Sequence, residues 1–216
     1  MGYTRQAAAL GFLFLGLVAL GEGRLRLFIF WALVAATFHK SAVLMLPMAA
    51  LAATERRLWT LVWVGVMALG GAYFFLLDHV DQLWDNYVVS ENYESQGGLI
   101  RVLMNAVPGL LFLVLRRRLH LSDAERKLWG WMAYFALLCV PLVMLSSTAT
   151  DRVALYLIPL QLFVFSRLHL TTLEPLARAA IVFGVISYYA TVQFVWLVFA
   201  GHTSAWLPYQ MVGFAS

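Results

Sequence analysis

The sequence predicts an all-α, polytopic transmembrane helical protein, and two observations support this prediction. Hydrophobic residues make up 62% of the 216 residues and charged residues only 12%, whereas soluble domains are about half apolar and about a quarter charged. The apolar residues also lie in long continuous runs with short charged segments between them. Such runs are typical of spanning helices, while a membrane β-barrel shows short alternating segments.

Seven apolar runs divide the chain, and the acidic segment 78–98 is predicted to be an extracytoplasmic loop between two of them. We interpret residues 1–216 as a single membrane domain. The first run begins almost at Met1 without the pattern of a signal peptide, so we expect the chain to be the C-terminal part of a longer polytopic protein. The runs are Gly2–Leu20, Leu27–Ala53, Leu58–Leu77, Leu99–Leu115, Leu128–Leu145, Val153–Phe165 and Ala179–Ala200.

Basic residues set the predicted orientation, because cytoplasmic loops of membrane proteins are enriched in Lys and Arg. The net charge of +4 therefore reflects membrane topology, and we expect no nucleic-acid partner. Of the 15 Lys and Arg residues, most fall in the predicted cytoplasmic loops: Arg24, Arg26, Arg56, Arg57, Arg116, Arg117, Arg118, Arg126, Lys127, Arg167 and Arg178.

The run Leu27–Ala53 lies between two basic groups that are both predicted to be cytoplasmic, so it must cross the membrane an even number of times. We predict a re-entrant hairpin in which Leu27–Thr37 enters and Ser41–Ala53 returns, since neither arm has the roughly 20 residues of a full span. Pro47 fits a broken helix in the second arm. The alternative is one long tilted span, which would leave the first basic group outside.

Four cations do not follow the orientation rule, namely Arg5, Lys40, Arg101 and Arg152. Each lies in a polar cluster at an outer helix end or at the hairpin tip, Phe38-His39-Lys40-Ser41. Cations that converge on one face suggest a polyanionic ligand, because the Arg fork and the Lys ammonium both suit phosphate oxygens. Arg152 is equally open to a local ion pair with Asp151.

Backbone and acid–base groups complete the candidate site. Gly97-Gly98 precedes Arg101 and would expose N–H groups at the start of a helix, although Gly-Gly is also typical of a flexible turn. His39 is open to three interpretations: an acid or base, a hydrogen-bond donor to a leaving phosphate, or a satisfied interior histidine. The outer carboxylates that could act as a base are Glu91, Glu94 and Asp151.

Several classes of chemistry have no support in the sequence. The nucleotide, zinc and serine-hydrolase motifs are absent, so we predict no metal and no cofactor. Cys139 is the single cysteine and lies inside an apolar run, which excludes a disulfide framework.

The ordered polar clusters resemble the EpsG family, Wzy-like membrane proteins of exopolysaccharide and O-antigen production. The resemblance covers nearly the whole chain and rests on Gly2-Tyr3-Thr4-Arg5-Gln6-Ala7, Ala36-Thr37-Phe38-His39-Lys40-Ser41-Ala42, Gly97-Gly98 with Arg101, Ser147-Thr148 through Asp151-Arg152, and Tyr156 to Pro159. It implies a multi-pass protein of the bacterial inner membrane with a GT-C-like fold. Members of the family carry further N-terminal spans, so we expect this chain to be part of a longer protein.

The resemblance also implies an activity: metal-independent, inverting glycosyl transfer that polymerises undecaprenyl-diphosphate-linked oligosaccharide repeat units at the periplasmic face. Expected partners are this substrate, membrane lipids, and a chain-length regulator or flippase. Candidate catalytic residues are His39, Glu91, Glu94 and Asp151, and candidate ligand-binding residues are Arg5, Gln6, Lys40, Ser41, Gly97, Gly98, Arg101 and Arg152. The alternatives are a transporter or flippase component for a lipid-linked glycan, or a non-catalytic scaffold of a secretion complex.

Overall fold

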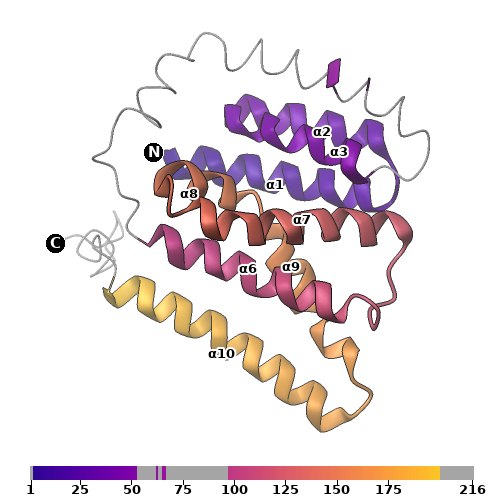
Figure 1. The fold of residues 1–216 in the computed structure, drawn as a ribbon, viewed down its shortest axis with the longest axis vertical. Coiled ribbons are helices and arrows are strands. Elements are labelled where there is room, and N and C mark those ends of the chain that lie inside the picture. Colours follow the sequence, from indigo (N-terminus) through magenta and orange to yellow (C-terminus); the bar gives the residue numbers. More distant parts are fainter. Residues whose placement is uncertain (1, 53–61, 63–64, 67–96, 200–216) are drawn as a thin grey trace, which may run out of the picture. The chain divides into compact units, whose positions relative to one another are not determined.

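The structure is a computed structural model that describes residues 2–52, 62, 65–66 and 97–199. All regular secondary structure in these residues is helical (Figure 1), which confirms the all-α prediction. The chain forms two compact units, Met1–Val164 and Phe165–Ser216. Nearly all of the run 58–77 and residues 78–96 of the acidic segment lie outside the described residues.

The first unit begins with an antiparallel pair of helices, α1 (Gly2–Gly21) and α2 (Leu25–Phe38), joined by a tight turn at Gly23. The two helices approach closely where α1 has Gly16, because a Cβ there would lie 3.3 Å from the ring of Phe28. Nearer the start of α1, Phe12 stacks on the ring of Phe38 with the centroids 5.1 Å apart. The beginning of α1 therefore lies beside the end of α2.

The helix is interrupted at the predicted tip of the hairpin. Helix α2 ends at Phe38, His39 is extended (φ −146°, ψ 111°), and the chain returns through the 3₁₀ helix η1 (Lys40–Met45) and α3 (Leu46–Ala52) (Figure 1). The alternative of one long span is wrong. The break lies at His39 and not at Pro47, which occupies the second position of α3, where no N–H is needed.

Helices α6 (Gly98–Leu115) and α7 (Asp123–Leu142) form a second close pair. A Cβ at Gly109 would lie 3.2 Å from the carbonyl of Ala133, so the helices touch through their backbones. Helix α7 begins five residues before the predicted run at Leu128. The reason is a capping box, in which the Ser122 hydroxyl accepts from the Glu125 N–H and the Glu125 carboxylate accepts from the Ser122 N–H.

The predicted run Val153–Phe165 belongs to two helices, α8 (Ser147–Leu155) and α9 (Ile158–Arg167), with a break at Tyr156 and Leu157. The run predicted from the sequence begins at Val153. The polar residues before Val153 are in fact the first turns of α8. Helix α8 packs against both α6 and α7.

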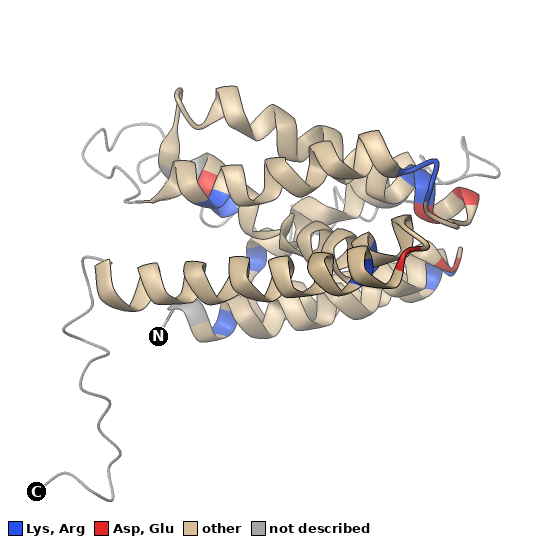
Figure 2. Cartoon of the chain, turned by 90° about the horizontal axis from the view of Figure 1, so that it is seen from below, with Lys and Arg blue, Asp and Glu red and all other residues tan. Residues whose placement is uncertain are grey.

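The helices of the first unit place charged residues at two opposite ends. A Cβ at Gly21 would lie 3.4 Å from the Glu125 side chain, so α1 ends beside the beginning of α7. We call the end that carries Arg24, Arg26 and Arg116–Arg118 the arginine end. The opposite end carries the beginnings of α1 and α6, the hairpin tip and α8, and we call it the site end. Figure 2 shows charged residues mostly toward the helix ends.

The second unit contains η4 (Leu168–Thr171) and the long helix α10 (Pro175–Phe199). Helix α10 begins four residues before the predicted run because Pro175 suits the first helical position. Its Arg178 donates from Nε to the carbonyl of Thr172 at 2.8 Å. Within the described residues four segments are long and apolar enough to span a membrane, which supports a polytopic membrane protein: Thr4–Gly21, Gly98–Leu115, Thr150–Thr171 and Pro175–Phe199.

Candidate functional site

A bidentate ion pair between α6 and α8 lies at the centre of the site end. Arg101 donates from Nε to Asp151 Oδ1 at 2.5 Å and from a terminal nitrogen to Oδ2 at 2.7 Å. The Asp151 side chain is only 12% exposed, whereas 40% of the Arg101 side chain is exposed. Two parallel hydrogen bonds fix the plane of the guanidinium as well as its position. Asp151 thus orients an arginine that still reaches the surface.

A buried amide network lies one helical turn below this ion pair. Asn105 donates from Nδ2 to the carbonyl of Ala154 at 2.7 Å, and Gln161 donates from Nε2 to Asn105 Oδ1 at 2.7 Å. Sequence analysis missed both amides. The available signal was their position, since a polar side chain inside an apolar run is costly unless it has a partner.

The hairpin tip is attached to α8 by a side-chain hydrogen bond. The Ser41 hydroxyl lies 2.6 Å from the Tyr156 hydroxyl. Tyr156 is only 2% exposed, so its hydroxyl needs a partner inside the protein. Sequence analysis used Tyr156 only as part of a family pattern. The structure places the tip directly against the C-terminal turn of α8.

His39 lies at the break between α2 and η1, outside the candidate spans, and is half-buried. Burial lowers its pKa below the ordinary value of 6.5, and the positive charge of Arg152 lowers that pKa further. The two side chains are therefore near enough for their charges to interact. Both effects favour the neutral imidazole, which has one hydrogen-bond donor and one acceptor.

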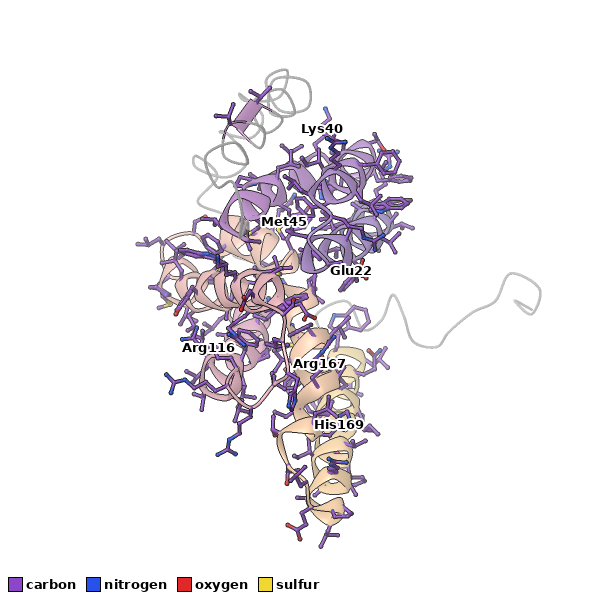
Figure 3. All side chains as sticks on the ribbon, turned by 90° about the vertical axis from the view of Figure 1, so that its right-hand side faces the viewer. Glu22, Lys40, Met45, Arg116, Arg167 and His169 are labelled. Atoms are coloured by element: carbon purple, nitrogen blue, oxygen red, sulfur yellow. The ribbon has the colours of Figure 1, made fainter. Side chains whose placement is uncertain are left out.

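The other three cations of the site end are exposed. Arg5 lies in the first turns of α1, Arg152 lies on α8, and Lys40 begins η1. In Figure 3 the Lys40 side chain lies at the outer edge of its helices, whereas Met45 at the other end of η1 points between helices. Together with Arg101 they are the four cations of the site end, and we call these four residues the cationic rim.

Three further predicted residues lie at the beginnings of α1 and α6. Gln6 is buried, and its Nε2 has no hydrogen-bond partner among the described residues. Gly97 adopts a positive φ of 82°, and a Cβ there would lie 3.8 Å from a terminal nitrogen of Arg101. Gly98 is buried as the first residue of α6. The Gly pair thus forms the turn that places Arg101 in the first turn of α6.

Two predicted acid–base candidates, Glu91 and Glu94, lie outside the described residues. The structure brings together His39, Ser41, Arg101, Asp151 and Arg152 on three neighbouring elements of the first unit. In the part of the chain that it describes, no group of three or more His, Cys, Asp or Glu side chains could hold a metal ion.

Fold and site together define a polytopic helical membrane protein with a cationic rim, an orienting carboxylate and a neutral histidine at one end of its helices. This arrangement suits a ligand with several phosphate oxygens. The model of the EpsG family matches residues 1–211, and the chain belongs to this family. The family indicates a polysaccharide polymerase-like membrane protein. No curated protein matches the chain, and no solved structure matches it.

Proposed function

We propose that this protein polymerises oligosaccharide repeat units linked to undecaprenyl diphosphate, at the periplasmic face of the bacterial inner membrane, in exopolysaccharide or O-antigen biosynthesis. The observation that carries the proposal is the Arg101–Asp151 pair on α6 and α8, with His39 and Ser41 of the hairpin tip beside the same helix α8. Membership of the EpsG family supports the same class of reaction.

The proposed step is an inverting glycosyl transfer without a metal. A hydroxyl oxygen of the acceptor glycan attacks the anomeric carbon of the lipid-linked donor, and the bond from this carbon to the diphosphate oxygen breaks. The hydroxyl proton passes to a base, and the lipid diphosphate leaves with both electrons of the broken bond. The leaving group gains one negative charge, so the protein must supply fixed positive charge at that oxygen.

In this proposal Arg101 stabilises the leaving diphosphate, and Asp151 orients its guanidinium. Arg152, Lys40 and Arg5 bind the remaining phosphate oxygens from the exposed rim. Neutral His39 accepts the hydroxyl proton or donates a hydrogen bond to the diphosphate. Because both Asp151 oxygens accept from Arg101, we assign this carboxylate an orienting role. Glu91 and Glu94 are the other candidate bases.

The direct test is a complementation experiment with the full-length gene in a strain that lacks it. Arg5→Ala, His39→Ala and Arg101→Ala are expressed singly, and polymer length is measured on gels. We expect short products or single lipid-linked units from these variants. Arg118→Ala and His120→Ala serve as matched controls, because both residues are exposed at the arginine end. Long polymer in all three site variants would refute the site assignment.

The location of the accumulated precursor separates this function from transport. In a deletion strain, single repeat units displayed on the periplasmic side indicate a missing polymerase. Units trapped on the cytoplasmic side indicate a missing flippase component. We expect the first result, and we expect the protein to work beside a flippase or a chain-length regulator.

A further inference from the structure

Helices α6 and α8 are joined at two points that lie one helical turn apart. The outer point is the Arg101–Asp151 pair, and the inner point is the hydrogen bond from Asn105 to the carbonyl of Ala154. Asn105 follows Arg101 by four residues and Ala154 follows Asp151 by three, so each helix presents both of its groups on one face. Two contacts along one face fix the register and the rotation of α8 against α6.

The inner contact is needed because α8 ends at this point. In a continuous helix the Ala154 carbonyl would accept from the N–H of Ile158. Here the helix breaks, and this carbonyl instead accepts from the N–H of Leu157 at 3.0 Å and from Asn105 at 2.7 Å. Pro159 has no N–H to donate to the next carbonyl of the helix, so the helix cannot continue through this break. Asn105 therefore holds the last turn of α8 where it would otherwise fray.

Gln161 determines which way the Asn105 amide faces. Its Nε2 donates to Asn105 Oδ1, which leaves Asn105 Nδ2 directed at the Ala154 carbonyl. Asn105 and Gln161 are 2% and 4% exposed, so neither amide can exchange these partners for water. The network is too deep for contact with a ligand at the surface of the site end.

We propose that Asn105 is a positioning residue, held by Gln161, that sets the orientation of the Arg101–Asp151 pair by fixing α8 on α6. The inference rests on the proposed function only for its activity readout. Without Asn105 the outer ion pair still forms, but α8 is free to rotate and the Arg101 guanidinium loses its single orientation. Activity then falls although every residue of the cationic rim is present.

The first test separates positioning from simple stability. Asn105→Leu removes the Asn105 Oδ1 acceptor of the buried Gln161 amide, so we expect a lower unfolding temperature in detergent. The double variant Asn105→Leu/Gln161→Leu removes both amides and regains most of this loss. We expect polymer length to stay short in the double variant. Recovery of both stability and long polymer in the double variant would overturn the proposal and leave a structural role.

The second test measures the orientation of α8 without using activity. The single cysteine is removed by Cys139→Ser, and a new cysteine is introduced on α8 by Thr150→Cys, at a buried position, or by Val153→Cys, at an exposed one. In the full-length protein a maleimide reagent should label position 153 at the same rate with and without the Asn105→Leu change. Labelling of position 150 should rise about tenfold in the Asn105→Leu background, as expected for loss of a contact that keeps a segment closed.

The labelling experiment and the activity measurement can contradict the proposals independently of each other. Unchanged protection of position 150 in Asn105→Leu overturns the positioning role whatever the polymer length. Faster labelling of position 150, together with full activity of Arg101→Ala, keeps the positioning role and refutes the proposed function of the site. A third outcome supports both the positioning role and the proposed function. In it, Asn105→Leu speeds the labelling of position 150 and lowers activity, and adding Asp151→Asn lowers activity no further. Asn105→Leu and Asp151→Asn then act through the same Arg101 guanidinium.

Discussion

Removing Arg101 should damage the fold far more than neutralising its partner. Asp151 is 8% exposed, so Arg101→Ala removes a bidentate positive partner from a buried carboxylate. Breaking a buried pair in this way costs about 3–5 kcal/mol, and we expect the low end, about 3 kcal/mol, because water reaches part of the site. Asp151→Asn leaves Arg101, which is 40% exposed and can be hydrated. We expect a loss of only about 1 kcal/mol there.

The double variant gives the sharpest outcome, because neutralising Asp151 should rescue the protein that lacks Arg101. The assay is the midpoint of thermal unfolding of the full-length protein in detergent, with Arg118→Ala as the matched arginine truncation. We expect Arg101→Ala/Asp151→Asn to be more stable than Arg101→Ala alone. If Asp151→Asn instead adds its own loss to that of Arg101→Ala, the carboxylate is not a buried partner and the orienting role is wrong.

Three further outcomes follow from the site end. The pKa of His39 lies below its ordinary value of 6.5, so the neutral imidazole is lost only when the pH falls below 6.5. Polymer formation in membrane vesicles should therefore decline at pH values below 6.5. The His39→Gln variant should not show this decline at low pH. Ser41→Ala and Tyr156→Phe should each cost about 1 kcal/mol of unfolding free energy, and together clearly less than the sum. Gly97→Ala places a side chain at a φ of 82°, which should lower stability by about 1 kcal/mol in the same thermal assay.

The helices were largely predictable because apolar runs report burial in lipid directly. The first run and the run before Arg116 match α1 and α6 to within one residue at each end. Helix starts were less predictable where polar residues belong to the helix. Ser122 and Glu125 form a capping box that carries α7 five residues ahead of its apolar run, and the same rule was available from the sequence.

The cations of the site were predictable, whereas their partners were not. Lys and Arg at outer helix ends conflict with the orientation rule, so Arg5, Lys40, Arg101 and Arg152 stood out without any structure. The partner of Asp151 was predicted as its neighbour Arg152 or left open, but its carboxylate binds Arg101, fifty residues away. Pairing between distant segments depends on helix packing, which periodicity along one helix does not specify.

The charge of the site end gives an orienting carboxylate a use in the proposed glycosyl transfer. Among the described residues this end carries four cations and one carboxylate, and burial and the charge of Arg152 lower the pKa of His39. In the proposed reaction a lipid diphosphate gains one negative charge when the glycosyl bond breaks, so that reaction would require charge that acts on the leaving oxygen and not on the bound substrate as a whole. A freely rotating arginine would stabilise the bound substrate and the transition state equally well. Held by Asp151 in a single plane, Arg101 can be aimed at the one oxygen whose charge increases, which converts binding energy into a lower barrier.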